Sequence, residues 1–585
     1  MASIDEIFNG AKTSGSKRKN EAIRDPNEIY KAARTGNTTP RHSQADDNDV
    51  EAGPALPPGD DEDIGPAIPE DDDDDEEGRF FGGGISKNEQ EVLDYVQGDD
   101  APVENIDEPW LRRKVIALEK HINKNAELRA RFEGEPQKFI SSEADLDADI
   151  KALSILAEYP ALYTELAKMG SVASLVGLLA HENTDIAIDV LQLLGELTDD
   201  EVEATEDQWD ALVTPMLDAD FLELLQSNLV RFNEDDEADS SGVYHGLWIL
   251  ENLCSGRSTI GERVATHKPL VTYLLTRASK SEPTGVSQNT QYCTEVLAIL
   301  AQSSKKACTS LVSLNAIDTV LQLVAPYRRK DPAKGSAEEE YLGNLFEILV
   351  CLVDGDAGKA KFLEAEGVEL CILLISDSKK AKTPALRLLD HATDNKADFK
   401  STTTATQVCM RVVDAAGLKP LFAAFYKTKD RDMLDHLLSL FASMLRLLPL
   451  DEAQRIRLLA KWVEKDYQKL GKLIERRQSF ARSLAAVDSK HGAVDGKLPS
   501  DANETVEDEF LTDQLSAGLF SLHNIDLALA WLVAEDGGVR SKVQREVGYS
   551  KILKTLEFLL EGINGESEGD DDTRAMLTTL VSLLK

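Results

Sequence analysis

Residues 170–197 read GSVASLVGLLAHENTDIAIDVLQLLGEL, and this stretch decides the fold. A turn-forming glycine opens it, and an apolar run, a polar break and a second apolar run with helical spacing follow. Similar openings occur at Ala219-Asp220-Phe221-Leu222, Lys268-Pro269-Leu270-Val271, Asn315-Ala316-Ile317-Asp318, Glu366-Gly367-Val368-Glu369 and Ala416-Gly417-Leu418-Lys419. They return about every 50 residues, which is near the top of the range for armadillo and HEAT repeats.

A repeat of this kind cannot bury its apolar face alone, so successive repeats stack around one elongated core. We therefore predict an all-α, armadillo/HEAT-like, right-handed superhelical solenoid with helical N- and C-terminal caps. The long groove of such a solenoid binds extended partners. The repeat pattern thus favours a scaffold over an enzyme.

Composition narrows the class of partner. The chain has 585 residues and a formal net charge of −41. A solenoid accommodates this length, because each repeat packs only on its neighbours. The negative charge argues against direct binding of nucleic acid through a phosphate-neutralising surface, and it favours basic partners such as Lys/Arg-rich peptides.

The sequence gives no sign of a metal site, a cofactor, a membrane span or a secretory signal. Its six cysteines lie in apolar helical stretches without a C-x-x-C pair, and its nine histidines lack metal-type spacing. Met1–Gly10 lacks a basic region followed by an apolar core, and no uncharged apolar run approaches about 18 residues. We expect a soluble, intracellular protein without a cofactor.

Residues 1–78 are poor in large apolar side chains and rich in Pro, Gly, Asp and Glu, which predicts a disordered acidic tail. Its basic cluster Lys17-Arg18-Lys19 is a candidate nuclear-localisation signal for an import receptor, or an incidental cluster of charge. The acidic tract from Asp60 to Glu77 keeps the segment extended. It either shields the protein's own groove from basic ligands or keeps the chain soluble, and we favour solubility.

Two aromatic residues and three glycines, in the segment RFFGGGI at 79–85, end this tail and suit a flexible joint with an aromatic anchor. Residues 79–165 are predicted to hold this segment and an N-terminal helical cap, residues 166–450 the repeats, and residues 451–585 a C-terminal helical region. Within the last region, residues 451–490 are predicted to form one long basic helix, and the acidic stretch Glu566–Asp572 a loop.

Several stretches of the chain closely resemble the beta-catenin-like protein 1 family, in the same order. They are RFFGGGISK (79–87) with LDYV (93–96), NAELR (125–129), LVGLL (175–179) with NTD (183–185), ELTD (196–199), YCTEVLAIL (292–300), NLF (344–346), LDHA (389–392), EDEFL (507–511) and AGLF (517–520). The resemblance spans roughly residue 79 to the C-terminal helices, whereas the tail departs from the family.

This resemblance implies a nuclear armadillo-type protein that is associated with the spliceosome through a NineTeen-type complex. In that family the solenoid binds basic, nuclear-localisation-like segments of splicing factors. The negative charge and the predicted groove agree with this implication. The alternative is a transport adaptor for basic cargo that resembles importin-alpha.

The candidate binding residues lie on the last helix of each repeat, which lines the inner groove in armadillo proteins. On the helix predicted at 184–198, Asp185, Asp189, Gln192, Glu196 and Asp199 fall on one polar stripe. This stripe either receives a Lys/Arg-rich peptide or is a solvated outer face. The further candidates, on later helices, are His245, Trp248, Asn252, Glu295, Asn344, Glu347 and Asp390.

Trp248 and Asn252 have the i, i+4 spacing that resembles the tryptophan/asparagine ladder of importin-alpha, where the two side chains hold a lysine stem and the peptide backbone. The pair occurs once here, whereas a true import receptor repeats it. A packed aromatic ring beside a helix-surface amide is therefore the favoured interpretation.

The basic residues from Arg455 to Arg477 form the one place where nucleic acid or an acidic partner can dock. Their alternatives are a solvated face or partners for the protein's own acidic surface. Ile456, Leu459, Trp462, Val463 and Leu470 on the same helix would suit self-association. No Ser/His/Asp order, metal cluster or phosphate loop stands out, so we expect no enzymatic activity.

Overall fold

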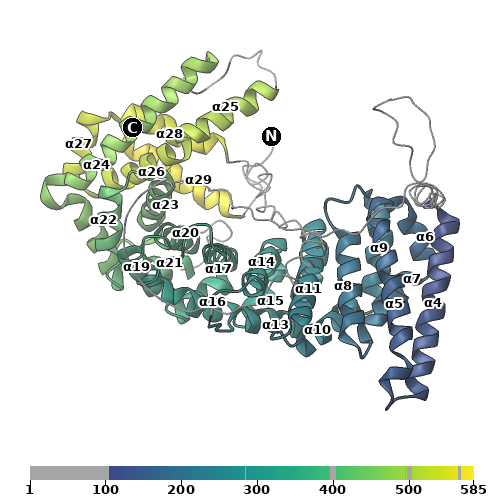
Figure 1. Cartoon of the computed structure of the whole chain (residues 1–585). Coiled ribbons are helices and arrows are strands. Elements are labelled where there is room, and N and C mark those ends of the chain that lie inside the picture. The colour runs from purple at the N-terminus through teal and green to yellow at the C-terminus, as the bar shows by residue number, and fades with distance from the viewer. Residues whose placement is uncertain are drawn as a thin grey trace, which may run out of the picture. The chain divides into compact units, whose positions relative to one another are not determined.

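The computed structural model describes residues 105–283, 285–394, 404–494, 496, 498, 504–563 and 568–585. By its contacts the chain divides into Met1–Gly98 and Asp99–Lys585, and all described residues belong to the second unit. These residues form a long series of α-helices, which confirms the predicted all-α solenoid (Figure 1). Short 3-10 turns lie at Pro136–Lys138, Ser154–Glu158, Pro160–Leu162, Leu178–Ala180 and Ala325–Arg328.

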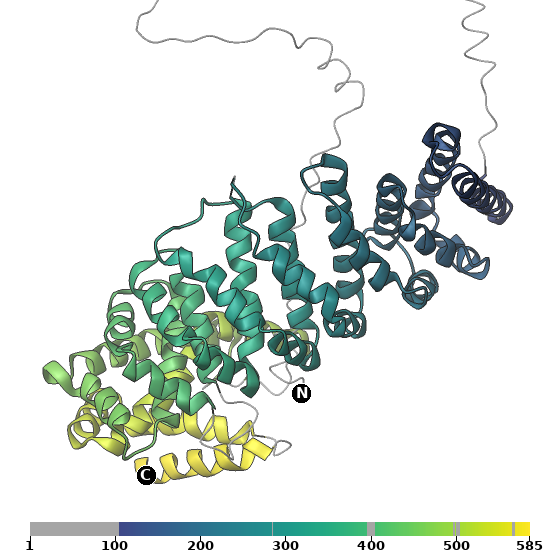
Figure 2. The same cartoon turned by 90° about the horizontal axis from the view of Figure 1, so that it is seen from below.

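Successive units of three helices, packed each on the next, make up the middle of the chain (Figures 1 and 2). The first helices are α6 (Tyr163–Lys168), α9 (Glu206–Asp218), α12 (Ser258–Thr266), α15 (Lys305–Ser313), α18 (Asp356–Glu364) and α21 (Thr404–Asp414). The second helices are α7 (Ser171–Gly177), α10 (Phe221–Arg231), α13 (Lys268–Ala278), α16 (Ala316–Val324), α19 (Gly367–Asp377) and α22 (Leu418–Lys427). The third helices are α8 (Thr184–Thr198), α11 (Glu237–Gly256), α14 (Gln288–Ser303), α17 (Ala337–Val353), α20 (Lys382–Thr393) and α23 (Arg431–Leu447).

The recurring openings in the sequence are the turns between the first and second helices. Gly170, Asp220, Asn315, Glu366 and Ala416 adopt φ of 75°, 57°, 62°, 56° and 60° at these turns. Glycine adopts such values freely, whereas a residue with a Cβ does so at a cost of about 1–2 kcal/mol. Five of the six turns therefore share one backbone conformation, although the residue that adopts it varies, whereas His267 at the remaining turn has φ of −78°.

The polar breaks in the sequence are N-caps of the third helices. The side chains of Asn183, Asp236, Ser287, Ser336 and Asp430 each accept a hydrogen bond from a backbone N–H in the following first turn. A cap of this kind satisfies one of the N–H groups that a helix start leaves unpaired and stabilises the helix by about 1 kcal/mol. These caps mark where five of the six third helices begin, whereas α20 follows Ala381, which has no capping side chain.

The third helices stack on one another in chain order, from α5 (Ile140–Ala152) through α8, α11, α14, α17, α20 and α23 to α26 (Leu519–Glu535). Their inward leucines, among them Leu194, Leu250, Leu297, Leu349 and Leu389, are 0–1% exposed and belong to one continuous core. Each third helix buries one side in this core, so only a narrow opposite side is left for a partner.

Other helices flank these units at both ends. At the N-terminal end, α4 (Glu108–Arg131) carries Pro109 in its first turn, and its cap Asp107 accepts from the Trp110 N–H at 2.9 Å. The C-terminal helices are α24 (Ala453–His491), α25 (Glu504–Ala517), α26, α27 (Gly537–Glu546), α28 (Tyr549–Glu561) and α29 (Glu568–Leu584).

The prediction of one long helix over 451–490 is wrong, because α24 is broken near its middle. Glu464 leaves the helical conformation, and Lys465, Asp466 and Tyr467 follow with φ of 53°, 55° and 59°. The Tyr467 hydroxyl donates to the Asp536 carboxylate at 3.2 Å, so the break is held from another helix. The stretch Glu566–Asp572 is also not wholly a loop, since α29 begins at Glu568.

No single helix among the described residues is long and apolar enough to cross a membrane. Two bent helix pairs, Lys305–Ser313 with Ala316–Arg328 and Thr505–Ala517 with Leu519–Glu535, meet the criteria of length and composition together.

Candidate peptide-binding face

The candidate site is built on the sides of α8, α11, α14, α17 and α20 that point away from the core. We call this surface the third-helix face. It carries the predicted residues of α8 and all seven predicted residues on the later helices. Because successive third helices pack directly together, side chains of neighbouring units reach one another across this face.

The five predicted residues on α8 and at its C-cap lie at spacings that place them on one side of the helix. They differ in exposure and in the groups that they contact. Asp185 is exposed, whereas Asp189, Gln192, Glu196 and Asp199 are partly buried. The Gln192 amide donates to Glu196 at 2.9 Å. Asp199 accepts from the backbone N–H of Glu201 at 2.8 Å, and burial raises its pKa. Asp185 and Glu196 form no ion pair with any described lysine or arginine, so both carboxylates can meet a cation from a partner.

Asp189 is held by the neighbouring helix α5. The Lys151 ammonium lies 3.3 Å from its carboxylate, and Asp147 of α5 stands beside it. Burial, together with the adjacent Asp147 carboxylate, raises the pKa of Asp189 to about 7. Asp189 therefore joins two third helices, and it offers a partner less charge than Asp185 or Glu196.

On α11 the tryptophan/asparagine pair is used inside the protein. The Trp248 ring packs so closely on Gly195 of α8 that a Cβ there would lie 2.6 Å from a ring carbon. The Asn252 amide donates to the Gly195 carbonyl at 3.1 Å. The Ser241 hydroxyl lies 3.2 Å from Nε2 of His245, and burial lowers the pKa of His245. The Trp248 ring and the Asn252 amide therefore join α11 to α8.

On the later helices two of the predicted acidic groups, Glu347 and Asp390, contact a side chain of the next helix. Glu347 of α17 is bound by both terminal nitrogens of Arg387, one at 3.1 Å. Asp390 of α20 lies 3.0 Å from Nδ1 of His436. Asn344 is partly buried on α17, and Glu295 of α14 accepts from the Gln291 amide at 3.0 Å.

This pairing divides the third-helix face into two parts. On α17 and α20, Glu347 and Asp390 are already engaged by Arg387 and by the His436 ring of the next helices. On α8, Asp185 and Glu196 have no ion pair with a described lysine or arginine, whereas Asp189 has Lys151. The α8 end is therefore where a basic segment gains most, because at Asp185 and Glu196 it displaces no described lysine or arginine.

The sequence did not reveal the internal partners Lys151, Arg387 and His436. Each lies on the third helix before or after its acidic partner, at a separation of 38 to 46 residues, but not at a constant one. The spacing alone could not identify these pairs, because the contact also depends on the rotation of each helix about its own axis.

Between Arg455 and Arg477, basic side chains pair with carboxylates of the protein itself. Partners for the protein's own acidic surface were one of the three alternatives for this segment. Arg455 is 1% exposed and binds Glu535 at 2.5 Å. Arg477 is 5% exposed, and its guanidinium binds the fully buried Asp526 at 2.5 and 2.9 Å. Of the apolar residues proposed for self-association, Trp462 and Leu470 are 0% exposed, whereas Ile456 is 62% exposed.

One group of side chains at the C-terminal end has the spacing of metal ligands. Ligand atoms of His491, Glu509 and Asp513 lie within 4.8 Å of one another. The Lys490 ammonium is 2.6 Å from Asp513 and 3.6 Å from Glu509, so a cation from the chain itself already balances these carboxylates. The group reads as an ion-pair cluster.

Several sequence predictions lie outside the described residues. They are the nuclear-localisation candidate Lys17, Arg18 and Lys19, the acidic tract Asp60–Glu77 and the segment 79–85.

Comparison with known proteins places this architecture. A family described as catenin-beta-like, Arm-motif containing nuclear matches residues 90–557. A beta-catenin-like protein 1 homolog of Schizosaccharomyces pombe is 38% identical over 471 residues, which are 80% of this chain and 81% of that protein. Beta-catenin-like protein 1 of Homo sapiens and that of Mus musculus are each 33% identical over 440 residues, or 73% of this chain and 76% of theirs. The chain belongs to the catenin-beta-like, Arm-motif containing nuclear family.

Proposed function

We propose that this chain is a non-enzymatic nuclear scaffold of the spliceosome, associated with a NineTeen-type complex. It binds basic, nuclear-localisation-like segments of splicing factors on the α8 end of the third-helix face. Import to the nucleus proceeds through the basic cluster Lys17-Arg18-Lys19. Membership of a family described as nuclear supports the compartment.

The proposal rests on two carboxylates of α8 that have no ion pair with a described lysine or arginine. Asp185 and Glu196 form no ion pair with the described lysines and arginines, whereas further along Arg387 binds Glu347 and the His436 ring contacts Asp390. A Lys/Arg-rich peptide laid across α8 supplies the missing charge. Because an exposed ion pair contributes only about 0.2–1 kcal/mol, specificity comes from several groups in register.

The mechanism has two steps. The acidic surface first raises the rate of encounter with a basic segment, and this contribution falls with ionic strength because the Debye length is about 8 Å at physiological salt. The segment then docks, with the carboxylates of Asp185 and Glu196 receiving its ammonium or guanidinium groups.

A transport adaptor of the importin-alpha type is the weaker explanation. Its ladder needs asparagine amides that are available to a peptide backbone, and the Asn252 amide is donated to Gly195 and to Thr198, at 3.1 and 3.3 Å. The pair at Trp248 and Asn252 thus serves helix packing.

The test is affinity purification from nuclear extract, read by mass spectrometry, with the full chain and with Asp185→Lys/Glu196→Lys. We expect splicing factors and NineTeen-complex proteins with the unaltered chain and their loss with the variant. The matched control is Glu133→Lys/Asp218→Lys, which makes the same change of net charge at two exposed positions away from the third helices. Recovery of import receptors and diverse basic cargo without splicing factors would overturn the proposal.

A further inference from the structure

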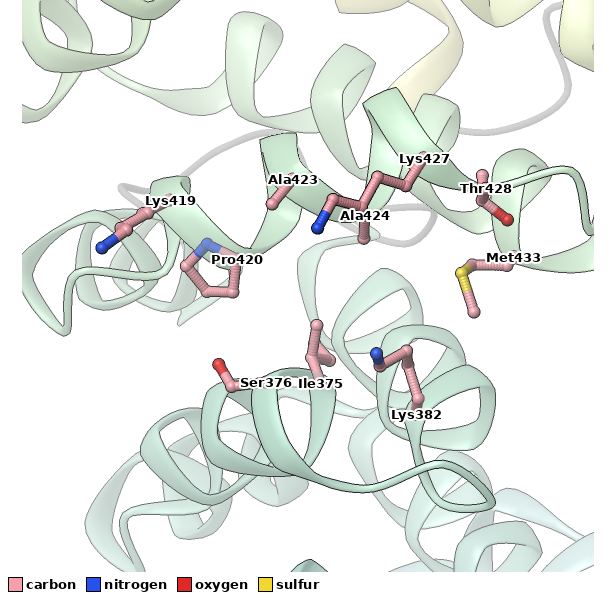
Figure 3. A pocket seen from close by; sticks show the side chains of 10 residues that line it. All are labelled: Ile375, Ser376, Lys382, Lys419, Pro420, Ala423, Ala424, Lys427, Thr428 and Met433. Carbon is pink, nitrogen blue, oxygen red and sulfur yellow. The ribbon is translucent and has the colours of Figure 1, made fainter.

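A hollow of about 580 Å³ lies on the side of the stack formed by α19, the start of α20, α22 and the start of α23 (Figure 3). It is far in sequence from α8 and shares no residue with the third-helix face as defined by its candidates. Its lining is Ile375, Ser376, Lys382, Lys419, Pro420, Ala423, Ala424, Lys427, Thr428 and Met433.

Among the residues that the structure describes, three lysines and no carboxylate line this hollow. Lys382, Lys419 and Lys427 form no ion pair with any described residue, although the chain has 105 acidic residues against 64 basic ones. Neighbouring cations of the same region are paired, as Lys380 is with Glu339 at 2.5 Å and Arg387 with Glu347. In Figure 3 the amino groups of Lys382 and Lys427 point toward one another across the hollow.

Helix electrostatics make two of these lysines unfavourable where they stand. Lys382 is the first residue of α20, and Lys419 is the second residue of α22. A cation in the first turn meets the positive end of the helix dipole, which costs about 0.3–1 kcal/mol, whereas an anion there is stabilised. The two helix starts and the three ammonium groups therefore favour the same ligand, an anion.

The shape of the hollow indicates a peptide. Its lining follows α22 from Lys419 to Lys427, which is about 12 Å at the rise of an α-helix, or the length of three to four extended residues. Between the lysines the lining is apolar, with Ile375, Pro420, Ala423 and Ala424. An apolar strip flanked by cations fits a short segment that carries an anionic side chain beside small or apolar ones.

We propose that this lysine-lined hollow binds a partner peptide that contains phosphoserine or phosphothreonine. A phosphate carries a charge of about −1.5 to −2 and three acceptor oxygens, so it can engage the facing ammonium groups of Lys382 and Lys427 at once. A single carboxylate offers half that charge. The site is opposite in charge to the third-helix face, so it receives a different ligand and stands independently of the proposed function.

The experiment is a fluorescence anisotropy titration of the full chain against a fluorescein-labelled peptide library with a fixed central phosphoserine and degenerate flanks. The same library with serine and with glutamate at the centre are the comparison probes. The test variant is Lys382→Gln/Lys427→Gln. The control is Lys268→Gln/Lys305→Gln, which removes two exposed lysines and the same charge on α13 and α15.

We expect the phosphoserine library to bind at least tenfold more tightly than the serine or glutamate library. The Lys382/Lys427 variant should lose at least tenfold in affinity, and the control should change less than twofold. Equal affinity for the phosphoserine and glutamate libraries, or equal losses in the two variants, would overturn the proposal. Competition by an unphosphorylated peptide of residues 60–77 at equal concentration would instead assign the hollow to the chain's own acidic tract and would also overturn it.

Discussion

Replacing Arg477 by methionine tests whether the basic half of α24 is structural. The guanidinium of Arg477 makes two hydrogen bonds to Asp526, whose side chain is 0% exposed, and the Thr555 hydroxyl donates to the same carboxylate at 2.7 Å. Methionine fills much of the volume but leaves Asp526 with the hydroxyl alone. Removal of one partner from a buried ion pair costs about 3–5 kcal/mol, because a buried charge is left uncompensated.

The assay is native-state hydrogen exchange of α26, which carries Asp526, read by mass spectrometry. It reports local opening, which suits a repeat array whose units need not unfold together. We expect protected amides of α26 to exchange about a hundredfold faster or more in Arg477→Met. Arg482→Met, an exposed arginine on the same helix, is the control and should change exchange less than threefold.

The pH dependence gives a second check on the same variant. Burial raises the pKa of Asp526. Without Arg477 this effect is unopposed, so the protonated carboxyl is favoured in the folded state and the free energy of unfolding falls as pH rises through that pKa. The defect should therefore be smaller at pH 5 than at pH 8. A change of less than 1 kcal/mol at pH 8 would refute the structural role of the pair.

Three further predictions concern the α5–α8 contact, one helix turn and the α8–α11 contact. Because the folded-state pKa of Asp189 is about 7 and exceeds its usual value, ionisation destabilises the fold as pH rises from about 4 to 7; Asp189→Asn should therefore gain about 1 kcal/mol over the unaltered chain at pH 8 and little at pH 5, by thermal unfolding. Ala416→Gly relieves a φ of 60° and should stabilise by about 0.5–1 kcal/mol, whereas Gly417→Ala would place its Cβ 2.7 Å from the Val412 carbonyl oxygen and should destabilise; opposite signs are required. Gly195→Ala would drive a methyl into Trp248 and should change tryptophan fluorescence and destabilise the α8–α11 contact by about 1–3 kcal/mol, and an unchanged spectrum and stability would contradict the close packing.

The sequence predicted the features of the fold that rest on local physics. The recurring openings coincide with the left-handed turns at Gly170, Asp220, Asn315, Glu366 and Ala416, because a break between two apolar helical runs is visible in the sequence. The helix predicted at 184–198 is α8 with the same bounds, since its Asn183 cap and its apolar spacing are both visible in sequence.

Features that depend on tertiary contacts were not predictable in this way. The break in α24 at Glu464–Tyr467 contains neither glycine nor proline, and it depends on a contact between Tyr467 and Asp536. The polar stripe of α8 was read correctly as one side of a helix. The ion pair between Asp189 and Lys151 could not be predicted, because it depends on where α5 packs against α8.

The three lysines of the hollow are a further feature that the sequence could not predict. Lys382, Lys419 and Lys427 span 46 positions and share no motif, and only the packing of α19 against α22 brings them to one cavity. The net charge of −41 gives no indication of a local basic site. The distribution of charge on the surface can be seen only in the folded structure.

The measurement that tests the central claim most directly is the affinity of the α8 end for a basic peptide. A fluorescein-labelled Lys/Arg-rich peptide would be titrated by anisotropy with the unaltered chain, Asp185→Lys/Glu196→Lys and Glu133→Lys/Asp218→Lys. Each reversal replaces an attraction of about 0.2–1 kcal/mol by a similar repulsion, so two should weaken binding by about 1–4 kcal/mol, or fivefold and more. We expect this loss only in the α8 variant, with a fall in affinity as salt rises. Equal affinity of the two folded variants would contradict binding at α8.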